Sequence, residues 1–315
     1  MKQQRFESQH AAQWDEITQI CAGKGDAIRL PALYRSLCQN LALARQRGYS
    51  PSLTDHLHTL VQLAHAKLYG ATPVRALTLR DWLLYLFPQR VRSEWRLLLV
   101  SLAAFWLVGA AVGLYVWLHP SSAYSWMRPE DLDQFVEMYS SSAKHLGRRD
   151  NQDDVLMFGF YIWNNVSICF RTFAAGLLGG LPAVLSVISN GMHGGVVAAW
   201  LTLNPTTKLN FWSFVVTHSS FEITGLNLAG VAGMRLGLAV IHPGRRSRRR
   251  ALLETGQYVL PILLGAATLT ATAAFFEAFW SSSSVIPASV KFTVGGLCWA
   301  SVIGYLGFAG RQHAR

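Results

Sequence analysis

Charged residues are scarce in this sequence. Only 14% of the 315 residues are Asp, Glu, Lys or Arg, whereas soluble domains carry about 25%. Hydrophobic residues make up 51% of the chain and gather in runs long enough to span a hydrocarbon core of about 30 Å. The lack of charge therefore excludes an ordinary soluble domain and indicates a membrane protein.

Paired cysteines are also missing. Cys21, Cys38, Cys169 and Cys298 show no C-x-x-C spacing, so we expect free thiols and no metal site built on them. The formal net charge is +11, which alone would suggest a nucleic-acid partner. The arginines flank the apolar runs, however, as they do in cytoplasmic loops of membrane proteins, and we expect no nucleic-acid binding.

Residues 1–75 predict a cytoplasmic helical module. Leu33, Leu37, Leu41 and Ala44 form one apolar stripe at helical spacing, and a second stripe follows after Pro51. The segment has no clustered acid–base set. We therefore interpret it as a docking or packing module rather than an enzyme core.

The remainder of the chain divides into two predicted parts. At 76–96, aromatic residues alternate with arginines, which predicts an amphipathic helix in the membrane interface, bent at Pro88. Residues 97–315 predict a transmembrane bundle, so the fold class is all-α. Its six expected helices cover about 97–118, 155–180, 183–202, 211–241, 257–280 and 291–310.

The arginine distribution predicts the orientation. Basic residues lie before the first spanning helix, in the 245–250 loop and at the C-terminal tail. With six helices all three segments fall on one side, which the positive-inside rule makes cytoplasmic. We expect a multi-pass protein of the bacterial inner membrane with both termini in the cytoplasm. Five or seven helices would place one basic segment outside.

One stretch, 211–241, organises the rest. It is apolar enough to enter a bilayer, yet it carries His218 and Glu222, which lie one turn apart on the same helical face. Ionisable groups at membrane depth are costly and therefore indicate functional sites. Small residues that permit close helix packing accompany them: Gly225, Ala229, Ala232, Gly230, Gly233 and Gly237.

Polar residues of the second and third helices are expected near the same depth, given a rise of about 1.5 Å per residue. The candidate intramembrane polar site comprises His218, Glu222, Asn164, Asn165, Asn190, His193 and Arg171. The alternative is that these residues only form hydrogen bonds between helices. His193, His218 and Glu222 are residue types that suit zinc, but their spacing fits no zinc motif. They are weak metal candidates, and we expect no metal and no cofactor.

Several motifs resemble the stage II sporulation protein M family. They are LYRSLCQNLALARQRG and LVQLAHAKLYG near the N-terminus, WNN and SNGMHGG in the second and third spans, and THSSFEITGLNLAGVAGMRLG in the fourth. The family form of the last motif is similar to H-G-x-x-E. Here Ser219 stands at the Gly position, while His218 and Glu222 are retained.

The resemblance implies an α-helical inner-membrane protein. In spore formers, the family implies a membrane partner of peptidoglycan-degrading enzymes during engulfment. In other bacteria, it implies an association with MoxR-type AAA ATPases and von Willebrand A-like proteins. Protein partners of this kind would bind the cytoplasmic helical module. Membrane lipids are expected partners as well, and homo-oligomerisation stays open.

Two classes of function remain open. In the first, the protein is a non-enzymatic scaffold for cell-envelope partners, or a channel- or transporter-like protein with a polar intramembrane site. In the second, it is an intramembrane enzyme, metal-dependent or not, acting on a lipid or envelope substrate. Ser219 and Ser220 lack the G-x-S-x-G context of a nucleophile, so the first class is favoured.

The predicted orientation is testable by cysteine labelling. A cysteine introduced at Ser142 should react with a membrane-impermeant maleimide in intact spheroplasts, because 119–154 is expected outside. A cysteine at Ser247, in the basic loop, serves as the matched control and should react only after the inner membrane is opened. The opposite pattern would overturn the orientation.

Overall fold

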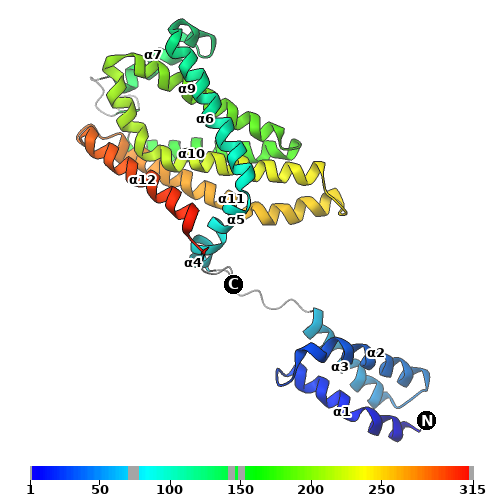
Figure 1. Ribbon diagram of the computed structural model, residues 1–315. Coiled ribbons are helices and arrows are strands. Elements are labelled where there is room, and N and C mark those ends of the chain that lie inside the picture. The colour runs from blue at the N-terminus through cyan, green and yellow to red at the C-terminus, as the bar shows by residue number, and fades with distance from the viewer. Residues whose placement is uncertain (1, 70–77, 141–145, 148–152, 312–315) are drawn as a thin grey trace. The chain divides into compact units, whose positions relative to one another are not determined.

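A computed structural model describes residues 2–69, 78–140, 146–147 and 153–311. These residues are helical and contain no β-strand, which confirms the all-α class. The chain divides into two compact units, Met1–Leu77 and Thr78–Arg315 (Figure 1). Each unit has its own core, and each is described by itself.

The first unit consists of three helices that pack against one another. They are α1 (Gln3–Cys21), α2 (Leu30–Gln46) and α3 (Pro51–Tyr69), with a short η1 (Ala27–Arg29) before α2. The apolar stripe predicted from the sequence fills the core, because Leu33, Leu37, Leu41 and Ala44 are all buried against α1 and α3. The unit is therefore stabilised by a continuous apolar core of its own.

The second unit begins with three short segments in series: α4 (Leu79–Asp81), the π-helical η2 (Trp82–Leu86) and α5 (Phe87–Ser93). Pro88 lies in the first turn of α5, where its missing N–H is tolerated, and the wide η2 turn precedes it. Phe87 and Val91 are buried against α11 and α12. The Arg92 guanidinium donates to the Leu306 and Ala309 carbonyls. This segment is therefore fixed to the bundle.

Six long helices form the bundle, and their bounds are α6 (Trp95–Leu118), α8 (Asp154–Ala175), α9 (Leu181–Leu203), α10 (Pro205–Ile241), α11 (Arg248–Phe275) and α12 (Ala288–Phe308). A π-helical turn, η5 (Phe276–Ser281), continues α11. Within the described residues, five helices are long and apolar enough to cross a membrane, and α8 is not among them. Because α8 carries Asn164, Asn165 and Arg171, the predicted count of six spans is not confirmed.

The sequence predicts a polar loop over 119–154, but the described part of this segment contains helices. Besides η3 (Pro120–Ser125), it holds the amphipathic α7 (Pro129–Tyr139), whose Leu132 and Tyr139 are buried. The Asn210 amide donates to the Tyr139 carbonyl, and the Leu146 N–H donates to the Ser282 carbonyl. The connections before α8, α10 and α12 therefore meet at one end of the bundle, which we call the α7 end.

Other contacts define the opposite end, which we call the α5 end. Arg235 on α10 pairs with the buried Glu94 at the start of α6, with 3.2 Å between Nε and Oε1. Ser93 and Tyr258 share a hydrogen bond of 2.7 Å between their hydroxyls. The turn η4 (Gly176–Leu178) after α8 packs onto the same part of α10, close to Gly233.

The central helix is α10. It contacts α6, α8, α9, α11 and α12, and 67% of its apolar window is buried, compared with 17% for α6 and for α12. Its small residues account for this position, because Gly225 and Gly237 lie against neighbouring atoms with no room for a Cβ, and Gly233 leaves only a tight space. The helix that carries His218 and Glu222 is therefore the core of the unit (Figure 1).

The helices α6 and α9 also pack closely through glycines. Gly109 and Gly113 on α6 face Gly191 and Gly195 on α9, each pair spaced four residues apart. A Cβ added at Gly195 would collide with the Gly109 carbonyl oxygen, whereas one added at Gly194 meets nothing within 4 Å. The helix α9 stays regular here. These glycines therefore serve close packing rather than local unwinding.

Gly194 and Gly195 offer a matched test of this packing. Gly195→Ala should lower the free energy of unfolding by about 1–3 kcal/mol, because the backbones must separate to admit the methyl group. Gly194→Ala should be neutral or stabilising by about 0.5–1 kcal/mol, because Ala favours a helix over Gly. Thermal unfolding of the purified protein in detergent measures both. Equal effects of the two substitutions would contradict the α6–α9 contact.

Candidate functional site

A cavity of about 1280 Å³ lies among the long helices of the second unit. Residues of α6, α8, α9, α10 and α12 line it, together with α7 at one end. Its wall is mostly aliphatic and aromatic. The polar lining side chains gather mainly where α8, α10 and η5 face one another, and they include His218, Glu222, Glu277, Asn164 and Asn165.

The helix α10 supplies His218 and Glu222. The His218 ring is only 5% exposed, and its Nδ1 lies 3.2 Å from the Ser281 hydroxyl. Its Nε2 points toward Glu222 at 4.0 Å from Oε2, which is too long for a hydrogen bond. About a third of the Glu222 side chain, 35%, stays open to the space beside it. The imidazole is therefore fixed on one side and free toward the cavity.

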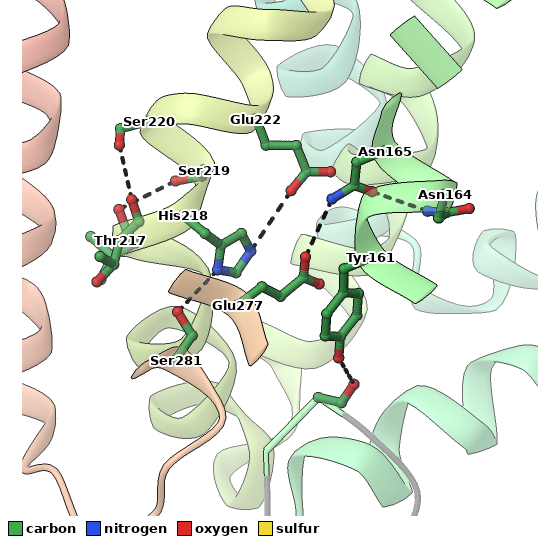
Figure 2. Close-up of polar contacts among 12 residues, drawn as sticks. Tyr161, Asn164, Asn165, Thr217, His218, Ser219, Ser220, Glu222, Glu277 and Ser281 are labelled. Atoms are coloured by element: carbon green, nitrogen blue, oxygen red, sulfur yellow. Dashed lines mark hydrogen bonds and ion pairs between the residues drawn. The ribbon is translucent and has the colours of Figure 1, made fainter. Parts of the chain in front are cut away.

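A second carboxyl group faces the same space. Glu277 on η5 accepts a hydrogen bond from Asn165 at 3.3 Å, and Asn165 in turn accepts one from the Asn164 amide at 3.1 Å. Glu277 lies near enough to Glu222 for the two carboxyl groups to interact electrostatically. Figure 2 shows the His218 ring between Ser281 and Glu222, with the Glu277 carboxyl facing Asn165. The site thus contains two carboxyl groups, one imidazole and two amides.

Glu277 was missed by the sequence analysis. It lies near the end of the fifth apolar run, where an acidic residue is expected to lie close to the membrane surface. The π-helical turn η5 adds a residue to the turn, which changes the direction of the following side chains. The buried Lys291 ammonium donates to the Ser281 and Ser283 carbonyls and so fixes the end of this turn. An acidic residue inside the sequence FFEAFW was the only available signal.

The other candidate residues are placed differently. Asn190 and His193 line the cavity on α9. The Asn190 amide donates to the Ser186 carbonyl of its own helix at 2.8 Å, and the His193 ring meets the Phe135 ring edge to face at 6.2 Å. Arg171 is exposed, donates to the Ser167 carbonyl of its own helix and does not line the cavity. The structure therefore does not bring Arg171 to the site.

The side chains of the polar site do not form a recognisable metal-binding group. Within the residues that the structure describes, no group of three or more His, Cys, Asp or Glu side chains could hold a metal ion. His218 and Glu222 approach each other, while His193 packs on α7 instead. In the same part of the chain, no Lys or Arg forms an ion pair with Glu222 or Glu277. Among the described residues, the two carboxyl groups are therefore without a Lys or Arg partner, and the His218 imidazole is the basic group beside Glu222.

The cavity wall does not extend along the whole length of α10. Leu226 is the last α10 residue in its wall, and beyond it the fully buried Asn227 accepts a 2.8 Å hydrogen bond from the Ser101 hydroxyl of α6. Toward the α7 end the wall includes Phe135 and Tyr139 of α7. The cavity therefore has a polar, tightly packed floor and an amphipathic helix across its other end.

The exposed start of α7 is polar. Arg128 and Asp131 form two hydrogen bonds of 2.9 Å, and this contact with the guanidinium lowers the pKa of the Asp131 carboxyl below its ordinary value. Asp131 is therefore ionised at neutral pH. A helix that begins with ionised, exposed groups and buries Leu132 on its inner side is suited to an interface between water and an apolar bundle.

Models of known families match both units of the chain. The model of the family described as Stage II sporulation protein M matches residues 101–282, more than half of the chain. This range contains every member of the polar site, Glu277 included. The model of a domain of unknown function matches residues 4–70, within the first unit. No curated protein and no solved structure matches the chain significantly.

Proposed function

The chain belongs to the stage II sporulation protein M family, and from this premise we propose that it is a transporter-like protein of the bacterial inner membrane. Its apolar helices make it a multi-pass membrane protein. The substrate would occupy the cavity between α6, α8, α9, α10 and α12. Glu222 and Glu277 would bind a cationic substrate there or exchange protons with the substrate.

One observation carries this proposal. Two carboxyl groups face a large cavity, and no Lys or Arg pairs with either of them in the described part of the chain. A carboxyl group away from water is costly unless it is compensated. A protein that acted only as a scaffold would gain nothing from this arrangement, whereas a bound cation or proton would compensate it.

The closed floor favours a transporter-like mechanism over an open channel. Below Glu222, the cavity ends at Leu226 and at the buried pair Ser101 and Asn227. A substrate that enters the cavity would need a rearrangement of the helices to leave at the α5 end. Polar groups near the middle of a bundle with one closed side are typical of alternating access.

The topology proposed with this function has six spans. The helix α8 would serve as the sixth, despite its polar residues, because Asn164 and Asn165 face the cavity rather than lipid. The α5 end, both termini and the 245–250 loop would be cytoplasmic, and the α7 end would be outside. Five apolar helices and the arginine distribution support this assignment.

A scaffold role for the N-terminal module is the second candidate. The module has its own apolar core and its own family model, so it can be a separate docking unit. It would bind a MoxR-type AAA ATPase system or envelope proteins on the cytoplasmic side. Leu63 and Tyr69 remain exposed on its α3. This role is compatible with transport, because the two functions would use different units.

An intramembrane enzyme has less support. The Ser219 and Ser220 hydroxyls donate to the Val216 and Thr217 carbonyls of their own helix. Neither hydroxyl is hydrogen-bonded to His218, which a serine nucleophile would require of its base. The hydroxyl that does contact His218, that of Ser281 at 3.2 Å from Nδ1, is fully buried and does not line the cavity. The described residues also lack a three-ligand metal group. Glu222 and His218 are therefore better suited to binding than to nucleophilic chemistry.

Proton movement into proteoliposomes tests the proposal. Wild-type protein reconstituted in bacterial polar lipids should take up protons faster than empty liposomes when valinomycin and a potassium gradient set the potential. Glu222→Gln and Glu277→Gln should each slow this uptake at least about tenfold, the effect of losing one charge-assisted contact. Both substitutions keep the size of the side chain, so the protein should still insert and fold.

Glu130→Gln is the matched control. Glu130 is exposed at the start of α7, so the same chemical change should leave uptake at the wild-type rate. Absence of uptake in the wild type would overturn the transporter-like role. Wild-type rates in both cavity variants would overturn the role of the two carboxyl groups.

A further inference from the structure

We propose that the ligand of this cavity is an alkylammonium-type amphiphile, with a primary ammonium head at Glu222 and Glu277 and an apolar chain along the aromatic wall. This inference rests on the intramembrane site of the proposed function and adds the chemical class of its ligand. Three features carry it: the acceptors at the polar end, the apolar shape of the remaining wall, and the apolar route of entry.

The polar end offers hydrogen-bond acceptors, and its two carboxyl groups carry negative charge once a bound cation compensates it. Glu222 and Glu277 supply carboxylate oxygens, and the His218 Nε2 faces Glu222 across 4.0 Å. Among the described residues, no Lys or Arg pairs with either carboxyl group. A primary ammonium has three N–H donors and one positive charge, so it can bind two carboxylates and an acceptor at once. A quaternary ammonium has no donor, and an anion would be repelled.

The remaining wall is apolar and aromatic. Trp106 on α6 and Trp299 on α12 meet with 6.3 Å between their ring centroids, and Phe105 and Phe292 lie on the same wall. Such a surface gains free energy by covering an alkyl chain, and aromatic faces also attract a nearby cation. A small hydrated ion would leave most of this surface uncovered, whereas a long chain would fill it.

The route of entry is apolar as well. Large side chains of the cavity wall remain about half exposed, including Trp106 at 46%, Phe160 at 54% and Leu209 at 59%. In a membrane, an opening between such side chains would face lipid rather than water. A hydrated ion would lose its water on this path, but an amphiphile already in the bilayer would not. The cavity is therefore suited to lateral entry.

The cation near the far end of the cavity does not oppose this assignment. Lys208 lines the wall beside the α9–α10 turn. It lies fourteen residues from Glu222 on the same helix, or roughly 21 Å at 1.5 Å per residue. Lys208 therefore acts on the mouth of the cavity, where it can bind a polar group, and not on the ammonium at its polar end.

Native mass spectrometry of the full-length protein in a neutral detergent tests the inference, with dodecylammonium as the probe. Wild-type protein and Glu130→Gln should form a saturable one-to-one complex. Glu222→Gln and Glu277→Gln should bind at least about tenfold more weakly. Dodecanoate and dodecanol, which have the same chain but no positive charge, should not form this complex.

Two further measurements keep the test independent of how well the carboxyl variants fold. In the wild type, dodecylammonium should bind at least about tenfold more tightly than butylammonium, because the longer chain buries more apolar surface. Trp106→Ala should weaken the binding of dodecylammonium and leave that of butylammonium unchanged. Equal binding of both amines would overturn the proposal that the ligand is an amphiphile. The site would then bind a small cation, which the proposed function allows.

The remaining outcomes separate the two claims. Binding of dodecylammonium that depends on Glu222, without proton uptake by the wild type, would support the ligand class and overturn transport. Binding that is equal in the wild type and in both carboxyl variants, or a preference for dodecanoate, would overturn the ligand class.

Discussion

The structure depends on placing carboxyl groups inside an apolar bundle without exposing them to lipid. A central charge costs about 3 kcal/mol for insertion of a single helix, and neighbouring helices that enclose Glu222 reduce this cost. The bundle does this by making α10 its central helix, with five long helices around it. The position of Glu277 on η5 follows from the same constraint, because Asn165 supplies a hydrogen bond to this second carboxyl group.

Small and large residues contribute differently to the enclosure of these carboxyl groups. Glycines on α6, α9 and α10 bring backbones into contact toward the α5 end and along the α6–α9 crossing. Aromatic side chains such as Trp106 and Trp299 hold helices apart at the cavity. Close backbone packing toward the α5 end and bulky aromatic side chains around the cavity leave a space between the helices. Its polar residues lie mainly where α8, α10 and η5 face one another. The same division explains why the cavity has a closed floor at Asn227.

Much of the fold could be predicted from the sequence. Apolar periodicity indicated the three helices of the first unit, because Leu33, Leu37 and Leu41 repeat at helical spacing and are buried. The four-residue spacing of His218 and Glu222 is enough to place them on one face of a helix. The family resemblance is confirmed by the match over residues 101–282. These patterns involve residues close together in the sequence, so helical geometry alone predicts which of them share a face.

The remainder depends on tertiary contacts that the sequence does not display. Glu277 turns into the cavity because η5 widens by one residue and Lys291 holds its end. Arg171 stays on the outer surface of α8, and depth along the helix alone could not decide which way it points. The apolar spacing within α7 was present, but the surrounding Ser, Asp and Glu residues made 119–154 read as a polar loop. Side-chain direction around a helix, not depth, was the missing information.

Covalent labelling with a hydrophobic carbodiimide measures the central claim most directly. Such a reagent modifies carboxyl groups that it reaches through the apolar phase, and peptide mass spectrometry identifies the modified residues. Glu222 and Glu277 should be modified in membranes, and dodecylammonium but not dodecanoate should protect both. Absence of modification at both residues, or modification that dodecylammonium does not slow, would contradict a ligand-accessible pair of carboxyl groups in this cavity.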